Sequence, residues 1–398
     1  GPGTTERRSA DGAGFWKHSV PASMEALRRK GKDEKNSMKK RIRIAQIGVR
    51  HEHADGKMMT LRTMPDEFEI VGVCAESPAD RETFGRRPCY DGLRWMSREE
   101  ILATPDLDAV AVETEMTELV PTATLCAERG LHMHMDKPGG ENLEDFGNLL
   151  ALCEKKKVIL QMAYMFRGNP AIQFCIEAAR KGWFGQIFEV YTSMSRARDS
   201  DQFRKWLSGY RGGGIFDFGS HLVDIIVSML GAPERVVSFQ QQLDGDGLND
   251  NGHAVLLYPK TIATIQTALQ QADSQQSRRL FVSGTNATFE LRPLEQEYIS
   301  YPKFNDRPLK ARFFLREGND AFAAGNHELE FGPMRDRYID QLEEFAACVR
   351  GEKINPYSFE HEYLVQKTVL AVSGYTKWEN HSAAAGSSET ETVFPQKS

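Results

Sequence analysis

The sequence predicts an α/β protein in which an N-terminal doubly wound domain precedes a C-terminal α+β domain with a largely antiparallel open sheet. Three observations predict this fold class. Buried-strand patterns alternate with helical patterns from residue 41 to about residue 163. Beyond that point, β-rich stretches follow one another at hairpin-like spacing. Two long helical patterns then close the chain before a polar tail.

Composition and charge exclude several classes of protein. The chain has 398 residues, 40% of them hydrophobic and 27% charged, which suits two to three globular domains. The 56 Asp and Glu residues outnumber the 50 Lys and Arg residues, for a net charge of −6, so we expect no nucleic-acid partner. No apolar run approaches the roughly 18 residues of a membrane span, so we expect no membrane association. Six cysteines without CxxC spacing predict reduced thiols and a cytoplasmic protein.

The first domain is predicted over residues 41–163, after a polar N-terminal extension (residues 1–40) to which we attach no chemistry. Short connections between alternating strands and helices require a parallel sheet with helices on both faces. The predicted strands are 41–49, 69–76, 106–114, 131–136 and 158–164. The predicted helices are 57–64, 121–130 and 141–156.

The second domain is predicted over residues 164–380, for substrate binding and oligomerisation, before a polar tail (residues 381–398). Its predicted strands are 187–195, 235–243, 252–259, 261–270, 278–286 and 287–294. Its predicted helices are 170–182, 212–231, 336–351 and 358–378. We expect the last two helices to return toward the first domain and the chain to form a homodimer or homotetramer.

The first candidate site is the turn that follows the first strand, from Gly48 to His53. Dinucleotide-binding turns usually read GxGxxG, because glycine lets the backbone approach the pyrophosphate at the helix N-terminus. Here Gly48 is present, while Arg50 takes the second glycine position and His53 the third. Glu76 follows the second strand and would favour NAD over NADP if it reaches the adenine ribose. A turn without a ligand and a solvated Glu76 are the alternatives.

Two stronger signals lie further along the chain. Lys137 and Pro138 follow a predicted parallel strand at its carboxyl end. A glycine-rich stretch leads into a helical pattern in which Asp217 and His221 are four residues apart and share one helix face, with Asp224 beyond them. A carboxylate beside an imidazole sets the tautomer and basicity of the ring. The alternative is a capped amphipathic helix whose polar side faces water.

From about residue 41 to residue 375 the chain resembles the Gfo/Idh/MocA family of nicotinamide-dependent oxidoreductases. The motifs that carry the resemblance are Asp136-Lys137-Pro138 for the family's Glu-Lys-Pro element, Asp217 and His221 in its glycine-rich helix, and Tyr164, Arg167 and Pro170 in its Tyr-x-x-Arg-x-x-Pro region. Their joint order on a Rossmann-like first domain implies an NAD(P)-dependent dehydrogenase or reductase. The implied reaction moves a hydride between the nicotinamide and a hydroxyl or keto carbon of a sugar, sugar derivative or inositol.

The resemblance also implies residue roles. Lys137 and His221 would flank a sugar or cyclitol hydroxyl, with His221 as the general acid/base and Asp217 orienting the reacting groups. The implied catalytic residues are Lys137, Asp217 and His221. The implied substrate-binding residues are Tyr164, Arg167, Trp206 and His221, with a core position for Trp206 as the equal alternative. The implied cofactor-binding residues are Gly48, Arg50, His51, Glu76, Thr114 and Lys137, for NAD with NADP as the alternative.

Two His-x-His pairs raise the question of a metal site, since residues two apart share a face on a strand. They are His51 with His53 and His132 with His134. Neither pair has a third ligand at a fixed spacing and no HExxH is present, so we predict no metal.

Two other functions stay open beside the dehydrogenase. One is an NAD-dependent glycoside-cleaving enzyme that acts through a transient keto-sugar and leaves NAD unchanged overall. The other is a non-catalytic nucleotide-binding sensor, which the incomplete glycine turn permits. The presence of Lys137, Asp217 and His221 argues against the sensor.

Overall fold

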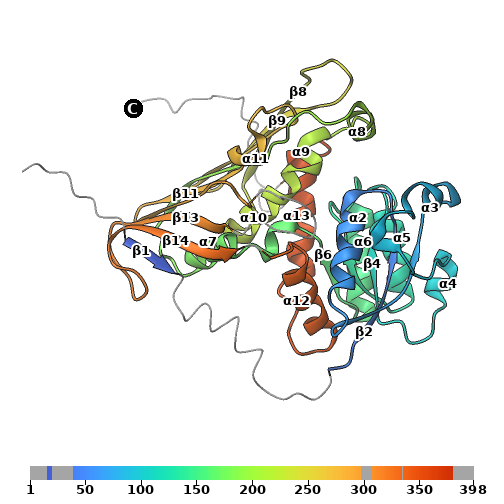
Figure 1. Cartoon of the computed structure of the whole chain (residues 1–398). Helices are drawn as coiled ribbons and strands as arrows, with labels where there is room; N and C mark the ends of the chain where they lie inside the picture. Colours follow the sequence, from blue (N-terminus) through green and yellow to red (C-terminus); the bar gives the residue numbers. More distant parts are fainter. Residues whose placement is uncertain (1–15, 20–38, 297–306, 334, 380–398) are drawn as a thin grey trace, which may run out of the picture.

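The computed structural model describes residues 16–19, 39–296, 307–333 and 335–379. Most of the predicted N-terminal extension and the whole predicted tail lie outside these residues. Figure 1 shows a domain of parallel strands and helices beside a second domain built on a long sheet. Of the helices in the described ranges, none has the length and apolar character needed to cross a membrane.

The first domain is built on a five-stranded parallel sheet in the order β3-β2-β4-β5-β6. Its strands are β2 (Ile42–Ile47), β3 (Phe68–Cys74), β4 (Ala109–Val112), β5 (His132–Met135) and β6 (Leu160–Met162). Every residue of β4 is buried, as expected for a central strand between two layers of helices. The doubly wound fold predicted for this part of the chain is confirmed.

Helices cover both faces of this sheet. One buried cluster joins the sheet to α5 (Leu119–Glu128) and α6 (Leu143–Lys156), and another joins it to α2 (Glu52–Arg62) and α12 (Ile339–Val349). The shorter helices are α3 (Pro78–Phe84), η1 (Pro88–Tyr90) and α4 (Arg98–Leu102). Because α12 comes from the end of the chain, the first domain's core is completed by residues more than 200 positions further along the sequence.

The second domain is built on a nine-stranded sheet in the order β1-β14-β13-β12-β11-β7-β10-β9-β8, with two parallel pairs, β1 with β14 and β7 with β10. The strands predicted from the sequence are β7 (Ile187–Ser193), β8 (Arg235–Gln241), β9 (Asn251–Leu257), β10 (Ile262–Ala268), β11 (Arg279–Gly284) and β12 (Ala287–Leu291). The sequence analysis missed β1 (Trp16–Ser19), β13 (Pro308–Leu315) and β14 (Gly325–Pro333). Of these, β1 lies within the predicted polar extension and pairs along β14, at the sheet edge.

Helices α7 (Pro170–Arg180), α10 (Gly219–Leu230) and α13 (Phe359–Val372) pack against this sheet. The remaining short helices are η2 (Met165–Gly168), α8 (Asp201–Leu207), α9 (Gly213–Asp217) and α11 (Ser274–Ser277). The prediction of one continuous helix over 212–231 is wrong in one detail. The helix is divided at Phe218 into α9 and α10, so Asp217 ends one helix and His221 lies in the first turn of the next.

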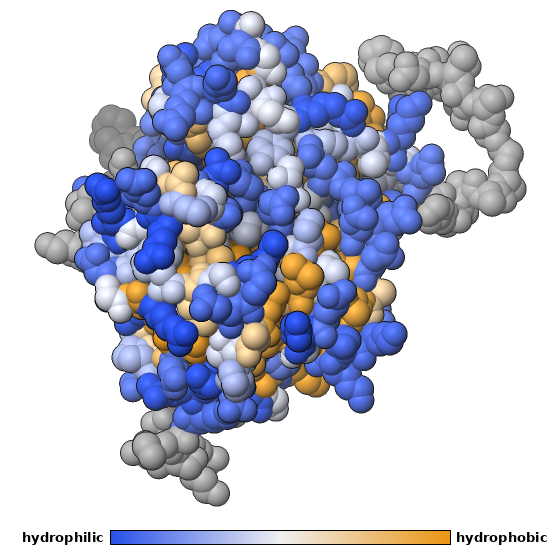
Figure 2. All heavy atoms as spheres, turned by 90° about the vertical axis from the view of Figure 1, so that its right-hand side faces the viewer, coloured by the Kyte–Doolittle hydropathy of each residue, from blue (hydrophilic) through white to orange (hydrophobic). Residues whose placement is uncertain are grey.

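The molecular surface on the side of the first domain is mostly hydrophilic, with apolar side chains gathered in the lower half of the view in Figure 2. The apolar side chains of the first domain's sheet are covered by helices on both faces. In the second domain, Phe188 on β7 and Ile262 on β10 are exposed on adjacent strands of the long sheet, and Phe239 is exposed on β8 at its edge.

Candidate active site

The turn between β2 and α2 needs glycine at its first position for reasons of packing. Gly48 has a φ of +111°, and a Cβ placed there would lie 2.0 Å from the carbonyl oxygen of Glu113, at the end of β4. Only glycine combines this backbone conformation with this close approach. The Gly48 N–H donates to the carbonyl of Cys74 at 2.9 Å, which ties the turn to β3. The turn therefore lies at the carboxyl edge of the sheet, where the strand order reverses and dinucleotides bind.

Buried polar atoms without partners surround this turn. Glu76 accepts a hydrogen bond from the Val49 N–H at 3.1 Å through one carboxylate oxygen, while its other oxygen is buried and has no partner among the described residues. The hydroxyl of Thr114, just beyond β4, is likewise buried and has no partner among the described residues. Burial raises the pKa of Glu76. Such atoms need a ligand or water to satisfy them, so this edge of the sheet fits a dinucleotide with hydroxyl groups to donate and accept.

Arg50 does not extend freely into this crevice. Its guanidinium Nε lies 3.4 Å from a carboxylate oxygen of Asp80 and 3.3 Å from one of Glu115. Glu115 also accepts hydrogen bonds from the Trp206 indole N–H at 2.8 Å and from the Tyr210 hydroxyl at 3.3 Å. Glu115 thus connects the turn of the first domain to α8 of the second. The sequence analysis singled out Arg50 and Trp206 but not the carboxylate between them, which only the fold brings into place.

His51 and His53 lie at the start of α2 and face Asp136, which follows β5. His51 is the N-cap residue, and its Nδ1 accepts a hydrogen bond from the Ala54 N–H at 3.3 Å. The Nδ1 of His53 lies 3.1 Å and 3.2 Å from the two carboxylate oxygens of Asp136. Burial alone would raise the pKa of Asp136, but the two imidazoles and the Lys137 ammonium hold it well below its usual range. The carboxylate is therefore ionised.

A second charged group is buried beneath this one. The Lys57 ammonium donates to a Glu113 oxygen at 2.6 Å and lies 2.8 Å from Nδ1 of His134, and none of the three side chains reaches solvent. Burial, and then the Lys57 charge, lower the pKa of His134 well below its usual range, so the ring is neutral. The His132/His134 pair therefore serves the interior of the domain. His132 accepts from the Ile159 N–H at 2.9 Å through its Nδ1.

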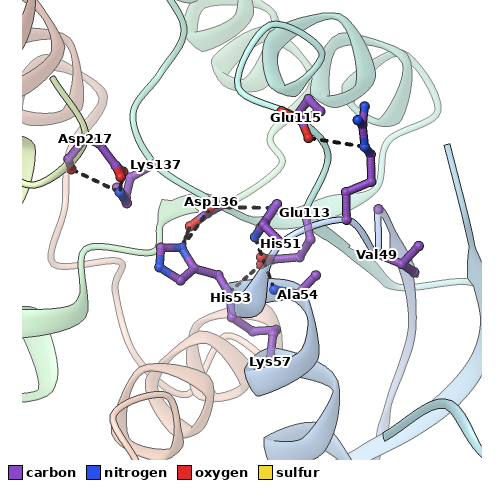
Figure 3. A network of polar contacts seen from close by, with 12 residues as sticks. Val49, His51, His53, Ala54, Lys57, Glu113, Glu115, Asp136, Lys137 and Asp217 are labelled. Atoms are coloured by element: carbon purple, nitrogen blue, oxygen red, sulfur yellow. Dashed lines mark hydrogen bonds and ion pairs between the residues drawn. The ribbon is translucent and has the colours of Figure 1, made fainter. Parts of the chain in front are cut away.

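Lys137 joins the two domains at the centre of the site. Its ammonium donates to the Asp217 carbonyl at 3.0 Å and to the Asp217 carboxylate. Figure 3 shows this pair beside Asp136 and the two histidines. An ammonium group has three N–H donors, and no described residue accepts the third. Lys137 is 2% exposed, so this N–H is held in a region from which most water is excluded.

His221 is buried close to Lys137. Its Nδ1 accepts a hydrogen bond from the Met165 N–H at 3.3 Å, and the rings of Tyr164 and Phe166 flank it at 5.9 Å. Burial, the Lys137 charge and His53 lower the pKa of His221 well below its usual range. A neutral imidazole that accepts at Nδ1 carries its proton on Nε2. In this geometry His221 presents a hydrogen-bond donor, whereas the sequence analysis implied a general acid/base.

Arg167, implied as a substrate-binding residue, is bonded entirely to protein groups. Its five N–H donors are taken by the carboxylates of Asp224 and Glu362 and by the carbonyl of Met162. Its guanidinium also lies over the ring of Tyr357 at 3.8 Å. No donor remains for a substrate, so in this arrangement Arg167 holds η2, α10 and α13 together.

A glycine turn at the carboxyl edge of a parallel sheet and a buried Lys–Asp pair beside a neutral histidine are typical of a nicotinamide-dependent oxidoreductase. Comparison with protein families agrees. Residues 42–164 match the model of an oxidoreductase family with an NAD-binding Rossmann fold, and residues 172–290 match the Gfo/Idh/MocA C-terminal domain. The chain belongs to the Gfo/Idh/MocA family of NAD(P)-dependent oxidoreductases, which act on CH–OH groups.

Curated relatives are similar at low identity. The trans-1,2-dihydrobenzene-1,2-diol dehydrogenase of Mus musculus is 25% identical over 248 residues, which cover 59% of this chain and 70% of the relative. The D-xylose 1-dehydrogenase (NADP(+)) 2 of Haloferax volcanii is 24% identical over 278 residues, covering 69% and 80%. A solved 3-ketoreductase of Actinomadura kijaniata, in complex with NADP and TDP-benzene, has a TM-score of 0.68 at 16% identity, covering 85% and 98%. That structure supports the fold.

Proposed function

We propose that this oxidoreductase transfers a hydride between NAD and the hydroxyl or keto carbon of a sugar, sugar derivative or cyclitol. The observation that supports it best is the pairing of Lys137 with His221. They come from different domains, both are buried, and each keeps an N–H that no described residue accepts. A substrate oxygen that gains or loses negative charge can accept both N–H groups. The names of the relatives above, a dihydrodiol and a xylose dehydrogenase, suit such a substrate.

The chemistry divides between the cofactor and these side chains. NAD, when bound, accepts or supplies the hydride at its nicotinamide ring. In the direction of reduction the Lys137 ammonium gives a proton to the substrate oxygen, and in the direction of oxidation its neutral amine takes the hydroxyl proton, while Asp217 holds the group in place. His221 donates its Nε2–H to the same oxygen and thereby lowers the cost of charge developing there. This scheme gives the proton transfer to Lys137, and it keeps Asp217 as the orienting residue.

Three residues around the crevice would hold the cofactor. The Gly48 turn leads into α2, whose N-terminal N–H groups and dipole favour a pyrophosphate. The unpaired Glu76 oxygen, at the end of β3, is placed for a ribose hydroxyl and would repel a 2′-phosphate, which favours NAD over NADP. Thr114 supplies a hydroxyl on the opposite side of the crevice. Tyr164 and Trp206 stay predictions as substrate-binding residues, as does the homodimer or homotetramer.

The test is a screen of purified protein with NAD or NADP against aldoses, ketoses, cyclitols and their keto forms, followed by absorbance of the reduced nicotinamide. We expect net reduction of NAD with at least one hydroxyl substrate, and loss of that signal in Lys137→Ala. Lys155→Ala, an exposed lysine on α6, serves as the control and should behave as the wild type. Cleavage of a glycoside without net NADH would replace this proposal by the transient keto-sugar mechanism.

A further inference from the structure

The group formed by His51, His53 and Asp136 is the strongest feature that the proposed reaction does not use. In the described part of the chain it is the one set of three His, Cys, Asp or Glu residues whose ligand atoms all lie within 4.8 Å of one another. Figure 3 shows the three side chains pointing toward one another. The two histidines come from the start of α2 and the carboxylate from the end of β5.

The distances in this group suit a metal ion. A tetrahedral ion with bonds of about 2.0–2.1 Å holds its ligand atoms roughly 3.3 Å apart. Asp136 Oδ2 lies 3.1 Å from Nδ1 of His53 and 3.8 Å from Nε2 of His51. The two histidine nitrogens lie within 4.8 Å of each other, so side-chain adjustment would bring all three atoms around one ion. Because only three side chains supply ligand atoms, a four-coordinate ion would keep one position open for water or a ligand.

One ligand atom is buried and unsatisfied. Nε2 of His51 has no hydrogen-bond partner in the residues that the structure describes, although it faces the Asp136 carboxylate. Nδ1 of the same ring is oriented by the Ala54 N–H, at the long distance of 3.3 Å. That weak cap bond would be given up when Nε2 binds an ion, since the remaining ring proton then lies on Nδ1. The Oε2 of Glu113, whose other oxygen is paired with Lys57, is also buried without a partner among the described residues.

We propose that His51, His53 and Asp136 bind one divalent transition-metal ion of the zinc class, between the cofactor turn and Lys137. Two imidazole nitrogens and one carboxylate oxygen are a donor set that such ions prefer over Mg²⁺ or Ca²⁺. This proposal departs from the prediction of no metal, which rested on the missing third ligand. Asp136 supplies it from 83 residues further along the chain, a distance that no fixed spacing could reveal.

The test is direct metal binding, measured on the full chain without NAD or substrate, so that its result is independent of the proposed reaction. Co²⁺ is titrated into protein treated with a chelator, and its visible absorption reports tetrahedral nitrogen and oxygen ligands; Zn²⁺ is then added in competition. We expect one Co²⁺ per chain, displaced by one Zn²⁺.

Matched variants localise the ion. His51→Asn keeps an N-cap side chain on α2, and His53→Gln and Asp136→Asn keep side-chain size while removing the ligand atom or its charge. Each should weaken Co²⁺ binding by at least about a hundredfold, because each removes one of three ligands. His253→Ala, an exposed histidine on β9, should bind as the wild type does. Circular dichroism of each variant checks that it is folded.

The proposal is overturned if the folded wild type binds neither Co²⁺ nor Zn²⁺ with a dissociation constant below about a millimolar, a free energy of roughly −4 kcal/mol. It is also overturned if the ion binds but His51→Asn and His53→Gln leave its affinity unchanged. In either case His53 acts only as a hydrogen-bond partner of Asp136, and His51 only caps α2.

Discussion

Two buried cations of this protein, Lys137 and Arg167, are both paired with carboxylates, yet they differ in how completely their donors are used. All five N–H groups of Arg167 are bonded, to Asp224 and Glu362 of the second domain and to the Met162 carbonyl at the end of β6. Lys137 meets only Asp217, through two of its three N–H groups. The two cations are similarly buried, so burial and charge alone do not separate a structural ion pair from a reactive one. The N–H donor that stays unbonded distinguishes the reactive pair from the structural one.

The same contrast holds for the carboxylates of the two clusters. Asp224 accepts from both Nε and Nη2 of Arg167, and His361 lies 3.5 Å away, so its charge is compensated inside the protein. Among the described residues, the Asp217 carboxylate accepts from Lys137 alone, and it lies at the junction of α9 and α10, where the second domain meets the first. The Arg167 cluster is therefore expected to carry stability, and the Lys137 cluster activity.

The largest effect that would break this comparison concerns Arg167. Arg167→Met keeps much of the side-chain volume but leaves Asp224 and Glu362 as uncompensated buried charges. We expect the free energy of unfolding to fall by about 3–5 kcal/mol. Urea denaturation followed by circular dichroism measures it. A loss below about 1 kcal/mol, the usual value for an exposed pair, would show that the cluster is not the structural element we infer.

Lys137→Ala should show the opposite behaviour. We expect turnover to fall by about a hundredfold to ten-thousandfold, the range for losing a positioned proton-transfer group, while the free energy of unfolding falls by less than in Arg167→Met, because one carboxylate rather than two loses its partner. Lys137→Arg should fail as well, because a guanidinium does not release its proton near neutral pH. Single-turnover hydride transfer at saturating cofactor is the measurement. Turnover above a tenth of the wild-type rate in Lys137→Ala would assign the proton transfer to another group.

Sequence reasoning could predict the parts of this site that depend on local patterns. Strand and helix periodicity predicts the parallel sheet, and motif position predicts Lys137, Asp217 and His221. It could not predict Glu115 as the link to Trp206, since that contact depends on how the domains pack. Nor could it predict the full set of strands. β14 has few apolar residues apart from Leu329 and Phe331, and its pairing with β1 joins segments about 300 residues apart.

His221 offers a finer test of what the unused N–H does. His221→Leu removes the Nε2–H donor and should lower turnover by about a hundredfold to a thousandfold, as for loss of one donor to a developing oxyanion. His221→Asn keeps an amide donor in a side chain of smaller size and should retain clearly more activity than His221→Leu. Equal activity in the two variants, at matched thermal stability, would contradict a donor role. A rate in His221→Asn as low as in Lys137→Ala would favour the general acid/base role instead.

The smallest expected effect is the pH dependence of stability caused by the neutral state of His221. Burial and the charges of Lys137, His53 and Arg337 hold the folded pKa of His221 well below the unfolded value of 6.5, against the opposing effect of Asp136. Below pH 6.5 the unfolded chain binds a proton that the folded protein does not, so stability falls as the pH falls. The slope is at most about 1.4 kcal/mol per pH unit.

Other groups change stability over part of the same range, so the measurement has to be a difference between two proteins. Burial raises the pKa of Glu76 and Glu113, and such carboxylates add stability on acidification, which opposes the histidine. Asp224, whose pKa is lowered by Arg167 against the effect of burial, loses its contribution to stability only as the pH falls below about 4.

Between pH 6.5 and 5, the wild type should therefore lose stability relative to His221→Asn, which has no ring to protonate. Urea unfolding of both proteins at several pH values in this window gives the difference. A difference that does not change with pH would mean that His221 is charged in the folded protein. The donor in the site would then be an imidazolium and not the Nε2–H of a neutral ring.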